Sequence, residues 1–130
     1  MIRQMRVAVI GQGYVGLTIS VGALSAGHEV IGVDLSNIVV TSLQNGKSHI
    51  EGISDGLVAA GISSGKFRPT SDYSDITGSE IVVIAVPTPL DQFGKPELAL
   101  LESAAKSLGK ALKTKTLIII TLVPLKANER

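Results

Sequence analysis

The sequence predicts an α/β fold with a doubly wound, mainly parallel sheet and helices on both faces. Three observations lead to this prediction. Short apolar segments rich in β-branched residues alternate with segments of helical period. These short segments are apolar throughout, which is typical of strands that are buried on both faces. A glycine-rich turn separates the first such segment from the first helical one.

Length and composition predict one ordinary domain of 130 residues with a core built from aliphatic side chains. Apolar residues make up 45% of the chain and aromatic residues only 3%. The formal net charge of +1 gives no basic surplus for nucleic acid, so no nucleic-acid partner is expected. The absence of cysteine excludes a disulfide framework, a thiolate metal site and a cysteine nucleophile, and is consistent with a cytoplasmic location.

No membrane partner is expected either, because no stretch approaches the roughly 18 apolar residues of a membrane span. The first 27 residues place basic residues before an apolar region, a pattern that also resembles a signal peptide. Gly11, Gln12 and Gly13 interrupt the apolar region, which favours two separate elements, a strand and a helix.

The first half of the chain predicts three strands and three helices. The expected strands are Arg6–Ile10, Glu29–Val33 and the weaker Phe67–Thr70. The expected helices are residues 15–26, ended by Gly27, residues 38–43, with Ser36 as N-cap, and residues 55–61.

The second half predicts two more strands, residues 81–86 and 116–121, with an amphipathic helix over residues 98–112 between them. The segment SDYSDITGS is expected to form a turn and a helical turn. The strand at 81–86 runs into Pro-Thr-Pro, through which neither a helix nor a central strand can continue.

The spacing of Gly11, Gly13 and Gly16 is the G-x-G-x-x-G pattern of Rossmann-type dinucleotide-binding folds. Gly11 would form the tight turn out of the strand, Gly13 would let the backbone approach a pyrophosphate, and Gly16 would let the helix pack closely on the sheet. The helix N-terminus would offer its free N–H groups and its dipole to the phosphates. Glycines also mark bulges and close packing, so the pattern depends on its context.

Asp34 supplies that context, because it ends the second strand 18 residues after Gly16. Its carboxylate would accept hydrogen bonds from an adenosine ribose and would repel a 2′-phosphate. No lysine or arginine follows in DLSNIVV, so NAD is favoured over NADP. The alternative is a residue that simply caps the turn after the strand.

Pro87, Thr88 and the preceding Val86 lie where the fourth strand should end, at the edge of a parallel sheet where ligands bind. A stiff loop without a binding role is the alternative.

Tyr14 would either shield the pyrophosphate or pack on the first helix. His28 is expected to be a surface residue, and neither His49 nor any neighbouring residue forms a pattern typical of a metal site. Lys47 and Lys95 could contact phosphate, although solvated loop lysines are the simpler interpretation.

Four segments together resemble the NAD-binding domain of the UDP-glucose/GDP-mannose dehydrogenase family: VAVIGQGYVGL, HEVIGVD, GKSHIEGI and VPTPLDQFGKPEL. The resemblance covers residue 6 to about residue 124, and GKSHIEGI and VPTPLD look more like the UDP-N-acetylhexosamine 6-dehydrogenases. It implies oxidation of a sugar 6-hydroxyl to a carboxylate by two hydride transfers to NAD. By position, the adenosine ribose would be held by Asp34, and the pyrophosphate would be held by Gly11, Gly13, Tyr14, Val15 and Gly16. The nicotinamide side would be lined by Val86, Pro87 and Thr88.

The sequence departs from the family pattern after the last strand. Where the family has Glu-Ser-Thr, this chain has Ile120, Thr121 and Leu122, and Lys126 replaces a glycine. An isoleucine cannot transfer a proton. The family's nucleophilic cysteine lies farther downstream, so no catalytic residue is assigned, and the sugar-binding and catalytic domains are expected to be absent from residues 1–130. A UDP-sugar partner would require those domains.

Three functions remain open at this point: the NAD-binding part of a nucleotide-sugar dehydrogenase, inactive alone; an NAD-sensing module without catalysis; and a site for another cofactor such as flavin or S-adenosylmethionine. A homo-oligomer is also expected, because the last strand would lack its usual cover and unpaired apolar edges favour association.

Overall fold

The computed structural model describes residues 3–86, 92–93, 99–111 and 116–120. Pro87 and Thr88 lie outside the described residues, as do Lys95 and residues 121–130 with their departures from the family pattern.

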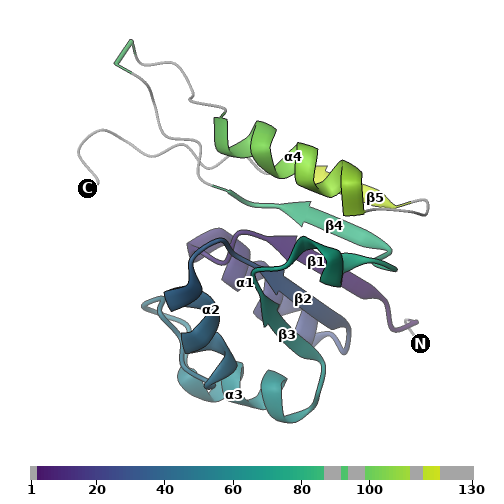
Figure 1. Cartoon of the computed structure of the whole chain (residues 1–130). Helices are drawn as coiled ribbons and strands as arrows, with labels where there is room; N and C mark the ends of the chain where they lie inside the picture. Colours follow the sequence, from purple (N-terminus) through teal and green to yellow (C-terminus); the bar gives the residue numbers. More distant parts are fainter. Residues whose placement is uncertain (1–2, 87–91, 94–98, 112–115, 121–130) are drawn as a thin grey trace.

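Five parallel strands form one sheet in the order β3-β2-β1-β4-β5 (Figure 1). The chain runs outward from β1 through β2 to β3, and then returns to place β4 on the other side of β1. This reversal makes the carboxyl ends of β1 and β4 a topological switch point, which is where doubly wound folds bind ligands. The strands are β1 (Arg6–Ile10), β2 (Glu29–Val33), β3 (Phe67–Thr70), β4 (Ile81–Ile84) and β5 (Leu117–Ile120).

Helices cover both faces of the sheet. On one face, α1 (Tyr14–Ser25), α2 (Asn37–Gln44) and α3 (Asp55–Ser63) pack on a cluster that includes Val7 and Val9. On the other face, α4 (Ala99–Ala111) and the short 3₁₀ helix η1 (Tyr73–Ile76) pack on a cluster that includes Ala8 and Ile10. Alternate residues of β1 thus point to opposite clusters, as the two-residue period of a strand requires. The predicted α/β, Rossmann-type, doubly wound sheet is confirmed.

Every expected element in the described residues is present, with ends that match the prediction or differ from it by at most two residues. The fourth strand, expected over residues 81–86, ends two residues early, at Ile84. The Ala85 N–H still donates to the Ile10 carbonyl (2.8 Å), but the Ala85 carbonyl then lies against Gly11. The chain leaves the sheet there because the turn after β1 occupies the adjacent space.

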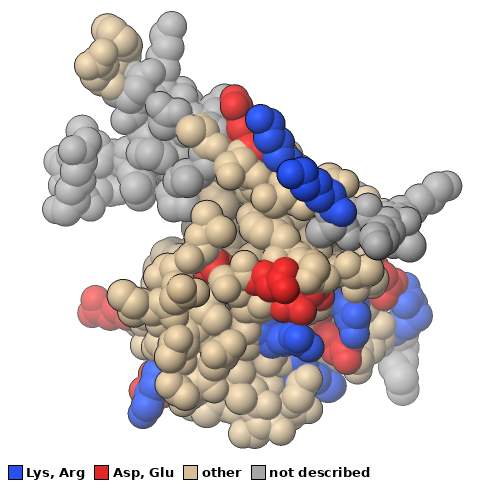
Figure 2. Space-filling model, viewed as in Figure 1, with Lys and Arg blue, Asp and Glu red and all other residues tan. Residues whose placement is uncertain are grey.

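Charged side chains of both signs are mixed over the face of the molecule shown in Figure 2. Several form exposed ion pairs, such as Arg3 with Glu80 (2.6 Å) and Lys47 with Asp55 (3.8 Å). The Arg3 contact lowers the pKa of the Glu80 carboxyl. Within the described ranges, no helix is both long enough and apolar enough to cross a membrane.

Candidate functional site

The turn from β1 into α1 depends on two glycines that no other residue could replace without strain. Gly11 has a φ of +94°, and a Cβ added to it would lie 2.6 Å from the Ala85 carbonyl oxygen. A Cβ on Gly16 would lie 1.6 Å from the Gly11 carbonyl oxygen. The Gly11 N–H donates to the Val33 carbonyl at 2.7 Å, which ties the turn to β2. These contacts bring the start of α1 directly onto the end of β1.

Gly13 differs from the other two glycines of the motif, because a Cβ there would meet no atom within 4 Å. Gly13 is the N-cap of α1, and no side chain caps this end of the helix. The first hydrogen bond of the helix runs from the Leu17 N–H to the Gly13 carbonyl (2.9 Å). The amides before Leu17 lack intrahelical acceptors, as the first amides of any helix do. An open approach to uncapped amides suits an anion.

Tyr14 and Val15 form the first turn of α1. Tyr14 is 70% exposed, so the interpretation that it packs on the helix is wrong. Its backbone position beside the uncapped amides leaves shielding of a bound phosphate as its remaining predicted role. Val15 is half-buried.

Asp34 connects the ends of β1 and β2. One carboxylate oxygen accepts the Gln12 N–H at 2.8 Å, and the other accepts the Ser36 N–H at 2.9 Å. Ser36 itself caps α2 by accepting the Val39 N–H (3.3 Å). Asp34 thus caps the turn after β2 by accepting the Ser36 N–H, and it is also bound to the glycine-rich turn through the Gln12 N–H, whereas the N-cap of α2 is Ser36.

Gln12 is a residue that the sequence analysis missed. Its side chain is fully buried, and its Nε2 donates to the carbonyls of Val9 (3.1 Å) and Gly11 (3.2 Å). Its Oε1 accepts the hydroxyl of the buried Ser20 on α1 (3.1 Å). A Cβ on Gly32 of β2 would lie 2.8 Å from the Gln12 Cδ, so the side chain fills the space over that strand. A polar residue between two glycines of the motif was the available signal.

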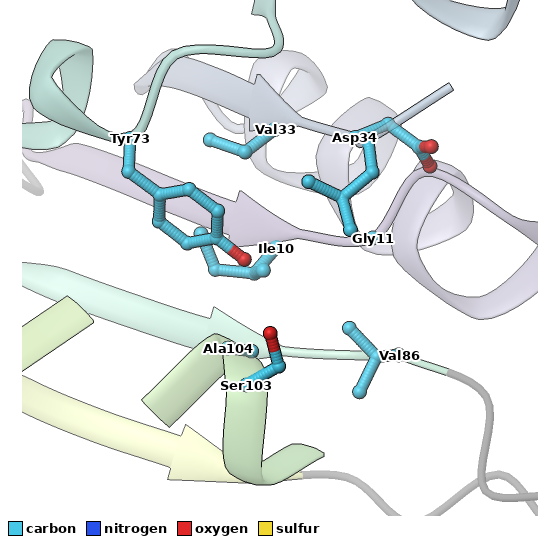
Figure 3. Close-up of a pocket in the computed structure, with 9 residues that line it drawn as sticks. Ile10, Gly11, Val33, Asp34, Tyr73, Val86, Ser103 and Ala104 are labelled. Carbon is cyan, nitrogen blue, oxygen red and sulfur yellow. The ribbon is translucent and has the colours of Figure 1, made fainter. Parts of the chain in front are cut away.

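Beside this turn lies a cavity of about 190 Å³ at the switch point of the sheet (Figure 3). The ends of β1 and β2 line one side and α4 lines the other, and the hydroxyls of Tyr73 and Ser103 point into the space between them. The lining is mostly apolar, with Asp34 at one end. It consists of Ile10, Gly11, Val33, Asp34, Leu35, Tyr73, Val86, Ser103 and Ala104.

Tyr73 of η1 is half-buried against this cavity. Burial of the ring and, to a lesser degree, the negative charge of Asp34 raise the pKa of the Tyr73 phenol above its ordinary value. Its hydroxyl is therefore neutral at physiological pH and can both donate and accept a hydrogen bond. Tyr73 was not predicted, because its place depends on how η1 packs across the sheet.

The described residues of this arrangement suit the binding of a nucleotide. The apolar cavity suits a base, and the Asp34 carboxylate at its end suits a ribose. The uncapped amides of α1 suit a phosphate. The described residues contain no group of three or more His, Cys, Asp or Glu side chains that could hold a metal ion.

Both histidines make hydrogen bonds that the sequence did not predict. His28, expected at the surface, is half-buried, and its Nδ1 accepts the Met5 N–H at 3.1 Å. The exposed His49 reaches the glycine-rich turn, with its Nε2 lying 2.6 Å from the Gln12 carbonyl oxygen. Lys47 pairs with Asp55 on the surface.

The NAD-binding domain model of the UDP-glucose/GDP-mannose dehydrogenase family matches residues 5–130. The chain belongs to this family. NAD is thus the cofactor of the domain, and the resemblance to the family is confirmed, which resolves the choice among NAD, flavin and S-adenosylmethionine.

Relatives in the family differ in the nucleotide sugar that they are named for. The chain is 41% identical over 115 residues to the GDP-mannose 6-dehydrogenase of Pseudomonas syringae pv. syringae, covering 85% of this chain and 26% of that protein. It is 34% identical over 117 residues to the UDP-N-acetyl-D-mannosamine dehydrogenase of Pyrococcus horikoshii, covering 89% of this chain and 28% of that protein. The chain thus spans about a quarter of the length of such relatives.

Solved structures agree with this assignment. A ternary complex of GDP-mannose dehydrogenase from Pseudomonas aeruginosa superposes with a TM-score of 0.85 at 30% identity, over 91% of this chain and 28% of that one. The similar part is the Rossmann-type domain.

The glycines allow folding and binding to be separated by experiment. In Gly13→Ser, the new hydroxyl should cap α1 in open space, so the free energy of unfolding should stay within about 0.5 kcal/mol of the wild type. The same hydroxyl should occupy the amides and weaken NAD binding at least about tenfold. Gly16→Ala, by contrast, should lose about 3 kcal/mol or more of stability, because its Cβ meets backbone. Chemical denaturation and calorimetric titration measure the two effects. A Gly13→Ser protein that binds NAD normally would contradict the assigned role of this amide cluster.

The environment of Tyr73 predicts a specific pH dependence. Because the folded-state pKa is raised, the contribution of Tyr73 to stability should be complete below the pKa of an unfolded tyrosine, about 10, and be lost as the pH rises through the folded-state pKa. The difference between phenolate absorbance titrations of the wild type and Tyr73→Phe isolates this group. Asp34→Asn should remove only part of the rise in the Tyr73 pKa, because burial of the ring is the larger cause. A Tyr73 midpoint at or below that of free tyrosine would refute the prediction.

Proposed function

We propose that this domain binds NAD with the adenosine in the cavity at the switch point and the pyrophosphate over the N-terminus of α1. The observation that supports this most directly is the position of Asp34, which lines the cavity and also accepts the Gln12 N–H of the glycine-rich turn. A ribose bound at Asp34 would lie between a base in the apolar cavity and a phosphate at the uncapped amides.

The proposed ligand set is the one expected from the motif. Gly11 and Gly16 shape the turn, Gly13, Tyr14 and Val15 face the pyrophosphate, and Asp34 binds the ribose. Val86, predicted with Pro87 and Thr88 to line the nicotinamide side, lines the cavity proposed here for the adenosine, and Pro87 and Thr88 lie outside the described residues. Leu35 and Tyr73, which also line the cavity, are the additional candidates for contact with the base.

We also propose that this domain serves a nucleotide-sugar 6-dehydrogenase, which oxidises a UDP-sugar 6-hydroxyl to a carboxylate through two hydride transfers to NAD. Residues 1–130 alone should then bind NAD without turnover, since Ile120 stands where the family pattern has a glutamate. An NAD-sensing module without catalysis is the alternative. A change of oligomeric state on addition of NAD or NADH would favour it.

Calorimetric titration with NAD and NADP tests the proposal. NAD should bind at least about tenfold more tightly than NADP, because the Asp34 carboxylate repels a 2′-phosphate and DLSNIVV offers it no cation. Asp34→Asn should weaken NAD binding and reduce the difference in affinity between NAD and NADP. Glu29→Gln is a matched control, because it removes a carboxylate at the opposite end of the same strand. Absence of NAD binding to the folded wild type would refute the proposed function.

We further propose that the chain associates with itself through β5. The side chains of Ile118, Ile119 and Ile120 are 46%, 43% and 55% exposed, although neighbours on a strand point to opposite faces. In the part of the chain that the structure describes, β5 is an edge strand that pairs with β4, and edge strands favour association.

Ile119→Lys should therefore shift the chain toward the monomer. The lysine would place a charge on the apolar surface of the edge strand, where it opposes strand pairing. Light scattering over a range of concentrations gives the association constant. Leu35→Lys, a change of another exposed apolar residue away from β5, is the control. A wild-type chain that stays monomeric at high concentration would contradict this proposal.

A further inference from the structure

The backbone of Gln12 is bound on both sides of the residue. Its N–H donates to Asp34 (2.8 Å), and its carbonyl oxygen lies 2.6 Å from the His49 Nε2. A carbonyl can only accept, so the His49 Nε2 bears the proton of this hydrogen bond. The contact joins residues 37 positions apart in the sequence.

This bond sets the direction of the next amide. The Gln12 carbonyl and the Gly13 N–H belong to one peptide plane, and no described peptide bond is cis. In a trans peptide the C=O and N–H point in opposite directions. A carbonyl held toward His49 therefore turns the Gly13 N–H away from the imidazole. Gly13 is also the N-cap of α1, and open space surrounds its α-carbon.

The loop that presents His49, residues 45–54 between α2 and α3, is itself well anchored. The Ser48 N–H donates to Asp55 at the start of α3 (2.8 Å), and the Ser48 hydroxyl bonds the Ile50 carbonyl (3.0 Å). Ile50 packs against the hydrophobic cluster beneath α1, α2 and α3. The residues on both sides of His49 are thus fixed, although the imidazole itself is exposed.

We propose that His49 is a positioning residue for the pyrophosphate: it holds the Gln12–Gly13 peptide so that the Gly13 N–H faces the dinucleotide. This inference rests on the proposed NAD site. Asp34 fixes one end of Gln12 and would contact the ribose, whereas His49 fixes the other end and acts only through the amide. The effect of His49 should therefore depend on the phosphates of the ligand and not on its adenosine.

The test compares NAD with adenosine, which lacks the pyrophosphate, by calorimetric titration. His49→Ala should weaken NAD binding about tenfold, which corresponds to the loss of one oriented hydrogen bond, and leave adenosine binding within about twofold of the wild type. His49→Gln should restore most of the NAD affinity, because the glutamine Nε2 can donate from nearly the same place. Glu51→Gln is the control, since it changes an exposed side chain of the same loop that the argument assigns no role in binding. Thermal unfolding of each variant checks that the fold is intact.

A second measurement does not depend on any variant. In the wild type, NAD should shift the NMR signal of the Gly13 amide strongly and adenosine should not. If His49→Ala binds NAD like the wild type, or weakens NAD and adenosine equally, the role of His49 is refuted while the proposed function stands. If Gly13 does not respond to NAD that binds, the role is likewise refuted. If the wild type binds no NAD, both proposals fail together.

Discussion

The close approach of α1 to the end of β1 is the contact on which the rest of the site depends. It exists because Gly16 has no side chain where the Gly11 carbonyl lies, and because Gly11 adopts a left-handed conformation beneath Ala85. The contact starts α1 immediately after the sheet ends, so the amides of its first turn open toward the switch point. A longer connection would have left the same helix on the same face without aiming its N-terminus at the cavity.

The network around Gln12 links the stability of the turn to the geometry of the site. A buried amide side chain must find hydrogen-bond partners, and this one finds Val9, Gly11 and Ser20. Its backbone is meanwhile held by Asp34 and His49. The turn is therefore formed before any ligand arrives, which lowers the entropic cost of ordering it on binding. The same atoms serve folding and binding. The stability of each variant of this turn should therefore be measured together with its affinity for NAD.

The sequence predicted the sheet, its helices and the glycine-rich turn because these follow from local period and composition. It also placed Asp34 correctly at the end of β2, but not its hydrogen bond to Gln12, which requires two strand ends to meet. Gln12, Tyr73 and His49 escaped prediction for the same reason: each has its role only through a neighbour distant in the chain. The strand over residues 81–86 was predicted too long, since apolar character continues after the hydrogen-bonded ladder ends.

Gly13 is the glycine of the motif that folding alone does not require, which is a physical reason to place a binding site beside it. Gly11 and Gly16 are each required by the backbone contacts that they make, so a fold without any ligand would still need them. Gly13 makes no such contact and has a negative φ, −77°, that any residue can adopt. A serine or aspartate at this N-cap would satisfy the helix amides and stabilise α1. A glycine there leaves those amides uncapped and the approach to them open, which is a cost for folding and an advantage only for an anion that binds the helix N-terminus.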